Sequence, residues 1–124
     1  MSTDYWSCDE FTQAYVTCAL WSTNDETDDS GGVPMDDNYG PDDIDPDTLR
    51  GMIRDCALFQ AHELDRIFLD LGRAGHDFWL TRNGHGAGFW DGDWPEDDGK
   101  WLTEVCKVWG EVNLSVGDNG LIYS

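Results

Sequence analysis

Residues 45–72, DPDTLRGMIRDCALFQAHELDRIFLDLG, decide which fold this chain adopts. Asp45 followed by Pro46 is a strong helix start, because the carboxylate caps the first turn and proline needs no amide partner there. Apolar residues then follow in two stripes at helical spacing, slightly out of phase, which end at Gly72: Leu49, Met52, Ile53, Cys56 and Phe59, then Leu64, Ile67, Phe68 and Leu71. The stretch predicts one long helix with a bend near residues 60–62, or two stacked helices.

Two further helices are predicted on either side of this stretch. Ser7 and Glu10 have the spacing of a capping box, and the apolar residues after them predict a helix over about residues 8–22. Residues 100–109 place their apolar side chains on one face, and Gly110 has the position of a helix end.

Two β-hairpins complete the prediction. Asn83-Gly84 is a strong hairpin signal between the short apolar runs 78–80 and 88–90. Residues 112–116 and 121–123 flank a second turn, Asp118-Asn119-Gly120. We therefore expect a single α+β domain over residues 1–124, with about three helices packed on a small antiparallel sheet built from the two hairpins.

Charge is the outlying property of the chain. It has 26 acidic and 7 basic residues, a net charge of −19, and its first 49 residues hold 13 of the acids and no Lys or Arg. A domain of this size is roughly 35 Å across, a length over which duplex DNA carries about 20 phosphates. Such a protein is repelled by nucleic acid, so the favoured partner is a basic protein surface.

The acidic residues gather in two segments predicted to be irregular. The first is a long loop at about 22–45, rich in Asp, Gly and Pro, and the second is residues 91–99. Val33, Met35 and Tyr39 are the apolar residues of the long loop, and would either anchor a partner or hold the loop against the domain.

Export and membrane insertion are not expected. No apolar run reaches about 18 residues, and Asp4, Asp9 and Glu10 stand where a signal peptide would be basic. The four cysteines, Cys8, Cys18, Cys56 and Cys106, have no CxxC spacing, which favours reduced, buried thiols over disulfides or zinc.

Residues 75–92, GHDFWLTRNGHGAGFWDG, are the densest cluster of unusual residues. This block resembles a stretch found in a family of small acidic proteins encoded by bacteriophages, mostly without an assigned activity. Residues 19–32 (ALWSTNDETDDSGG) and 112–124 (VNLSVGDNGLIYS) resemble the same family. The resemblance implies a phage origin and a host cytoplasm as the place of action, and carries no catalytic residue with it.

Two other function classes remain open from the sequence. In an enzyme, His76 or His85 would act as a general base and Arg82 would hold an anion, although no Ser or Cys nucleophile is adjacent in sequence. In a calcium-binding protein, Asp91, Asp93 and the acids that follow would gather around the ion, but Pro95 breaks the EF-hand pattern.

The leading hypothesis is a binding protein without catalytic residues, metal or cofactor: an inhibitor that mimics nucleic acid. Its carboxylates would occupy the basic groove of a host restriction enzyme, CRISPR effector, DNA glycosylase or RNA polymerase, and it would be a monomer or a homodimer. An acidic phage accessory or structural protein, whose charge only keeps it soluble, is the alternative. The expected partner-binding residues are Asp25, Glu26, Asp28, Asp29, Asp36, Asp37, Asp42, Asp43, Asp45 and Asp47, extended by Asp91, Asp93, Glu96, Asp97 and Asp98.

Overall fold

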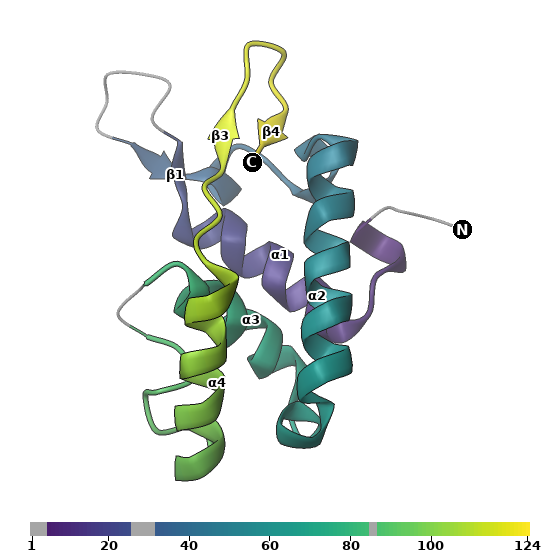
Figure 1. The fold of residues 1–124 in the computed structure, drawn as a ribbon. Coiled ribbons are helices and arrows are strands. Elements are labelled where there is room, and N and C mark those ends of the chain that lie inside the picture. The colour runs from purple at the N-terminus through teal and green to yellow at the C-terminus, as the bar shows by residue number, and fades with distance from the viewer. Residues whose placement is uncertain (1–4, 26–31, 85–86) are drawn as a thin grey trace.

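The computed structural model describes residues 5–25, 32–84 and 87–124. Its main elements are four α-helices (Figure 1): α1 (Glu10–Ser22), α2 (Pro46–Ile67), α3 (Leu71–Arg82) and α4 (Glu96–Trp109). Three short 3-10 helices lie around α1 and before α2: η1 (Tyr5–Ser7), η2 (Met35–Asp37) and η3 (Pro41–Asp43). The strands are β1 (Asn24–Asp25), β2 (Val33–Pro34), β3 (Ser115–Val116) and β4 (Ile122–Tyr123).

The predicted fold class, an α+β domain with three helices on a sheet of two hairpins, is wrong. The described chain is mostly helical, and its strands form two separate antiparallel pairs, β1 with β2 and β3 with β4. Each pair joins only two residues of each strand, so neither offers a surface on which helices could pack. The predicted C-terminal hairpin is present, shortened to the β3–β4 pair.

The predicted hairpin around Asn83-Gly84 is a helix end instead. Residues 78–80 belong to α3, and Asn83 follows its last residue, with the Asn83 side-chain amide donating to the Trp79 carbonyl at 2.9 Å. Gly84 has φ of +70°, the conformation that both a hairpin turn and a helix C-terminus require of glycine. The aromatic residues before it favoured a strand, whereas tertiary packing selected the helix.

The predicted helix boundaries also shift. The residue that caps α1 is Asp9, whose carboxylate accepts from the Thr12 amide at 2.9 Å, and Ser7 lies in η1 instead. The long helix α2 is continuous but ends at Ile67, and Gly72 lies inside α3 rather than ending α2.

Helix α4 begins one turn earlier than predicted. Its first residue is Glu96, so the second half of the predicted acidic loop 91–99 is helical. Three acidic residues in its first turn, Glu96, Asp97 and Asp98, favour this start because they interact with the positive end of the helix dipole.

The core is built where α1 crosses α3, the most extensive contact between helices. The Phe59 and Phe78 rings stack with centroids 4.1 Å apart, and Phe11 and Tyr15 of α1 pack against the same pair at 5.3 to 6.0 Å. Gly75 permits this crossing, because a Cβ built on it would lie 2.0 Å from the Phe11 carbonyl oxygen. The absence of a side chain at Gly75 thus sets the α1–α3 distance.

The predicted burial of the cysteines is confirmed for three of them. Cys18, Cys56 and Cys106 are buried, whereas Cys8 is partly exposed.

None of the described helices is both long enough and apolar enough to cross a membrane.

Replacing Gly75 by alanine will destabilise the fold by about 2–3 kcal/mol, because the added methyl group forces α1 and α3 apart. Chemical denaturation measures the change. The matched control is Gly72→Ala in the same helix, where the nearest atom to an added Cβ belongs to the flexible Glu10 side chain. The control should match the wild type or exceed it slightly, and equal losses in both variants would contradict this account.

Candidate functional site

The acidic segment, residues 32–47, is held against the helices by two buried side chains. Met35 is 1% exposed, and its amide donates to the Thr23 carbonyl at 2.8 Å. Ile44 is 4% exposed and pairs with Ile122 of β4, and the Asp45 amide donates to the Ile122 carbonyl at 2.8 Å. The segment is therefore fixed at two points along its length.

Most carboxylates of the acidic segment have local partners. Asp43 accepts from the Gly40 amide at 2.8 Å, Asp45 caps α2 by accepting from Thr48, and Asp47 forms an ion pair with Arg50. Two others, Asp36 and Asp37, are exposed in η2 and have no hydrogen bond or ion pair within the described chain. These two are the most available to a partner.

Trp6 adds an aromatic surface beside the acidic segment. Its indole Nε1 donates to the Asp42 carboxylate at 3.1 Å, and the residue is 66% exposed. Met35, in contrast, is buried and holds the segment in place, so it is not available as an anchor. Sequence reasoning did not find Trp6, because 36 residues separate it from Asp42.

A second acidic group, residues 91–98, lies at the start of α4 and is largely neutralised. Asp93 pairs with Arg73 at 2.9 Å, Asp98 with Arg66 at 2.8 Å, and Glu96 with Lys100 at 3.4 Å. Asp91 accepts from the Gly88 amide at 3.3 Å, and Asp97 is exposed. Within the residues that the structure describes, no group of three or more His, Cys, Asp or Glu side chains is arranged to hold a metal ion.

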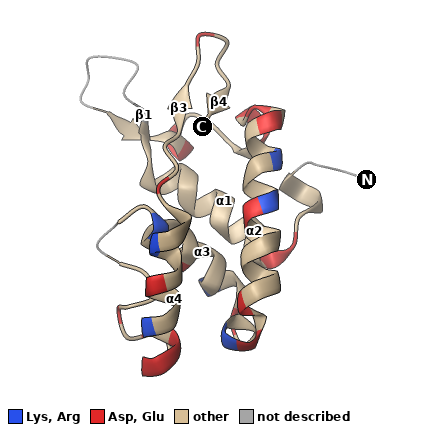
Figure 2. Cartoon of the chain, viewed as in Figure 1, with Lys and Arg blue, Asp and Glu red and all other residues tan. Residues whose placement is uncertain are grey.

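The two acidic groups lie at opposite ends of the molecule. Asp45 caps the first turn of α2, whereas Asp98 binds Arg66 in its last turn. The 22 residues of α2 therefore separate the groups by about 30 Å. Figure 2 shows acidic residues at the start of α2 and of α4, at opposite ends of this view.

All seven basic side chains are already in ion pairs. They lie on α2, α3 and α4 (Figure 2), and Arg50 is the one that pairs with a carboxylate of the acidic segment, Asp47. The pairs are Arg50–Asp47, Arg54–Asp55, Arg66–Asp98, Arg73–Asp70 and Asp93, Arg82–Asp55, Lys100–Glu96 and Lys107–Glu104.

Four of the fifteen predicted partner-binding residues have no described side chain. Asp25 lies in β1, and its neighbours Glu26, Asp28 and Asp29 lie outside the described residues. His85 also lies outside them.

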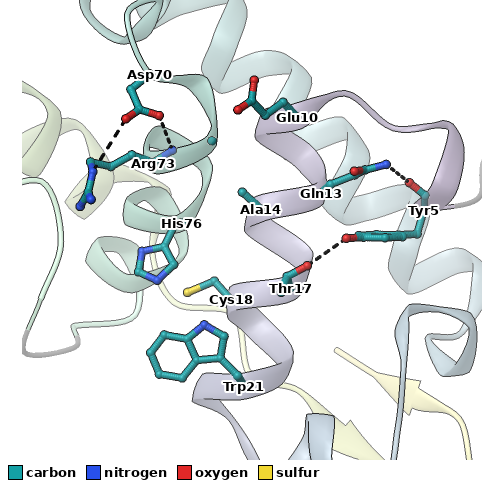
Figure 3. A pocket seen from close by; sticks show the side chains of 11 residues that line it. Tyr5, Glu10, Gln13, Ala14, Thr17, Cys18, Trp21, Asp70, Arg73 and His76 are labelled. Atoms are coloured by element: carbon teal, nitrogen blue, oxygen red, sulfur yellow. Dashed lines mark hydrogen bonds and ion pairs between the residues drawn. The ribbon is translucent and has the colours of Figure 1, made fainter.

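The other predicted histidine, His76, lines a groove of about 740 Å³ between α1 and α3 (Figure 3). Its ring packs against Trp21 with centroids 5.7 Å apart, and its Nδ1 is 3.4 Å from the Asp77 carboxylate. Glu10 and Arg73 line the same groove, where Arg73 faces Asp70.

The groove offers a thiol but not a nucleophile. Cys18 points from α1 toward His76 (Figure 3), yet it is 0% exposed, and burial raises the pKa of its thiol to about 12. Such a thiol stays protonated at neutral pH, and only a thiolate attacks efficiently. The geometry therefore does not support covalent catalysis at this groove.

Asp77, which sequence reasoning passed over, is a buried carboxylate behind His76. It is 2% exposed and accepts from the Trp94 indole at 2.7 Å. Desolvation by burial raises the pKa of this carboxyl, although the hydrogen bonds from Trp94 and His76 act in the opposite direction. Its ionised form thus costs free energy in the folded state.

Arg82, proposed in the enzyme interpretation to hold an anion, is a core residue. It is 6% exposed and donates to the Asp55 carboxylate at 3.0 Å and the Tyr15 hydroxyl at 3.1 Å. It also donates to the carbonyls of Trp109 and Gly110 at the end of α4. Its donors are therefore occupied, and it is not available to bind a substrate.

Comparisons of the chain with models of protein families, with curated proteins and with solved structures found no match.

As the pH rises, the Asp77→Asn variant will gain stability relative to the wild type. Because the pKa of Asp77 is raised on folding, its favourable contribution is complete below about pH 3.8, the unfolded value, and is lost as the pH rises through the folded value. Asparagine keeps an acceptor for Trp94 and does not ionise. Melting temperatures from pH 3 to 7 measure this effect, with Asp97→Asn as an exposed control of equal charge change. Identical pH trends in the two variants would refute the assignment.

Replacing Arg82 by lysine will lower the free energy of unfolding by about 2–4 kcal/mol, because one ammonium group cannot replace four directed hydrogen bonds. Arg50→Lys, at an exposed ion pair on α2, should change it by less than about 0.5 kcal/mol. Denaturant unfolding compares the two variants. If the Arg82→Lys protein is as stable as the Arg50→Lys control, Arg82 does not hold the core together and is again a candidate for binding an anion.

Proposed function

We propose that this protein is a phage-encoded inhibitor that mimics nucleic acid and binds the basic groove of a host nucleic-acid-binding protein. The observation that carries the proposal is the acidic segment: its six acids between residues 36 and 47 have no Lys or Arg among them. They stand on a backbone fixed by Met35 and Ile44. The carboxylates take the place of phosphates in this proposal, and the resemblance of residues 75–92 is what supports a phage origin.

The proposed contact involves fewer residues than the fifteen predicted from the sequence. Asp36 and Asp37 are available to a partner, whereas three of the five acids of the second acidic group are paired with Arg66, Arg73 and Lys100. The acidic segment is therefore proposed as the contact, and the group at residues 91–98 is not.

Binding combines a charged and an aromatic contribution. Carboxylates accelerate association with a basic surface, and this effect weakens as salt screens it. Affinity also needs a desolvated anchor, for which exposed aromatic residues are well suited. Trp6, held beside Asp42 by its indole hydrogen bond, supplies that anchor in this proposal.

The first test is a pull-down from a bacterial lysate with the immobilised protein, with and without duplex DNA as competitor. The captured protein should bind nucleic acid, leave the resin when duplex DNA is added, and lose its DNA complex in a gel-shift assay when this protein is present. Capture of no nucleic-acid-binding protein, or capture indifferent to DNA, would overturn the proposal in favour of an acidic accessory protein.

The second test locates the contact on the captured target. Asp36→Asn with Asp37→Asn should weaken binding at low salt by about tenfold, because it removes two unpaired charges from the acidic segment. Glu96→Gln with Asp97→Asn carries the same charge change at the other end of the molecule and should weaken binding by less than about twofold. Equal losses would mean that overall charge, rather than the acidic segment, determines binding.

A further inference from the structure

The outward face of α2 is exposed and partly apolar. Helix α2 packs on the core through buried residues such as Cys56, Phe59 and Ile67, each 0% exposed. On its opposite side, Leu58 is 46% and Phe68 is 59% exposed. Leu58 and Phe68 are ten residues apart, so a contact surface here requires the residues between them to fit a partner as well.

Six residues form a line along this face, which we call the α2 seam. Their spacing alternates between three and four residues, the spacing that keeps side chains on one side of a helix where two helices pack together. They are Gly51, Arg54, Leu58, Ala61 and Asp65 of α2, and Phe68, which directly follows its last residue and keeps a helical backbone.

The α2 seam is complementary to itself when it is reversed. If two α2 helices pack antiparallel, with the two-fold axis midway between Leu58 and Ala61, Leu58 of each copy faces Ala61 of the other. In the same register Arg54 faces Asp65, so opposite charges meet. At the ends the Phe68 ring faces Gly51, where a built Cβ would have nothing within 4 Å.

We propose that the α2 seam is the interface of a homodimer in which two α2 helices pack antiparallel. A two-fold interface brings the same patch of both copies together, so it requires this self-complementarity. Large side chains oppose small ones, which lets the helices approach closely, and one ion pair forms on each side of the axis.

The charges of the α2 seam are available for this contact. Arg54 has a side chain 72% exposed, and its ion pair with Asp55 is long, at 3.7 Å. Asp65 is exposed and has no ion pair or hydrogen bond among the described residues. A uniformly basic partner would meet Arg54, whereas a second copy offers a carboxylate to it, so charge complementarity favours the second copy.

Net charge opposes the association. Two chains of net charge −19 repel each other, and salt screens this repulsion over about 8 Å at physiological ionic strength. The dimer should therefore become tighter as salt is added, whereas binding to a basic target should weaken. The proposed dimer does not depend on the proposed function, and the opposite responses to salt keep the two distinguishable.

The test is sedimentation equilibrium of the full chain, with Arg54→Asp, Asp65→Arg and the double variant. At about 0.15 M salt the wild type should approach twice its 14.0 kDa monomer mass as the concentration rises toward about 1 mM. Each single variant should dimerise at least about tenfold more weakly, because symmetry creates two like-charged contacts. The double variant should recover to within about threefold of the wild type, since the pairs re-form in reverse.

Matched controls make each outcome decisive. Lys107→Asp and Glu104→Arg carry the same charge changes on α4 and should leave dimerisation within about threefold of the wild type. Circular dichroism and melting temperature show whether each variant is folded, and Leu58→Ser, an uncharged change in the α2 seam, should also weaken the dimer. A wild type that stays monomeric at about 1 mM, or a double variant that does not recover, would overturn the proposal.

Discussion

The fold depends on one buried cation. Arg82 is the last residue of α3, and its guanidinium joins Tyr15 of α1, Asp55 of α2 and the last carbonyls of α4. Its charge also lies over the aromatic rings of Phe78 and Trp109, at 5.3 and 5.6 Å. In a chain with so many carboxylates, a single interior cation fixes four helices relative to one another, because a buried charge is stable only when its donors are satisfied.

The buried carboxylates follow the same constraint. Glu63, 6% exposed, accepts from the Trp101 indole at 2.7 Å, as Asp77 does from Trp94. Tryptophan suits this role because its apolar ring can pack beside a carboxylate while its N–H binds it. Trp94 does so from within the core, at 9% exposed, and Trp101 from the surface, at 50% exposed. Part of the high tryptophan content thus serves to hold acids inside the protein.

The two proposed surfaces divide the exterior of α2. Its first turn continues from the acidic segment, which contains no Lys or Arg. Its outward face carries the α2 seam, in which Arg54 and Asp65 lie among apolar residues. In the antiparallel dimer the two copies of Pro46 would lie about 40 Å apart along the helix axes, so the acidic segments would point to opposite ends of the assembly. The surfaces would then act at the same time without competing.

The sequence by itself determined what depends on near neighbours: the start of α2 at Asp45-Pro46, the buried face of α4, the turn before β4, and the charge asymmetry that carries the functional proposal. Tertiary structure decided the rest. Asn83-Gly84 suits a hairpin and a helix end equally, and only the packing of α3 against α1 through Gly75 selects the helix. Tertiary structure also decided which acids are paired and which are exposed. Contacts such as Arg66–Asp98 join residues distant in the chain, and local sequence does not specify which residues become neighbours in space.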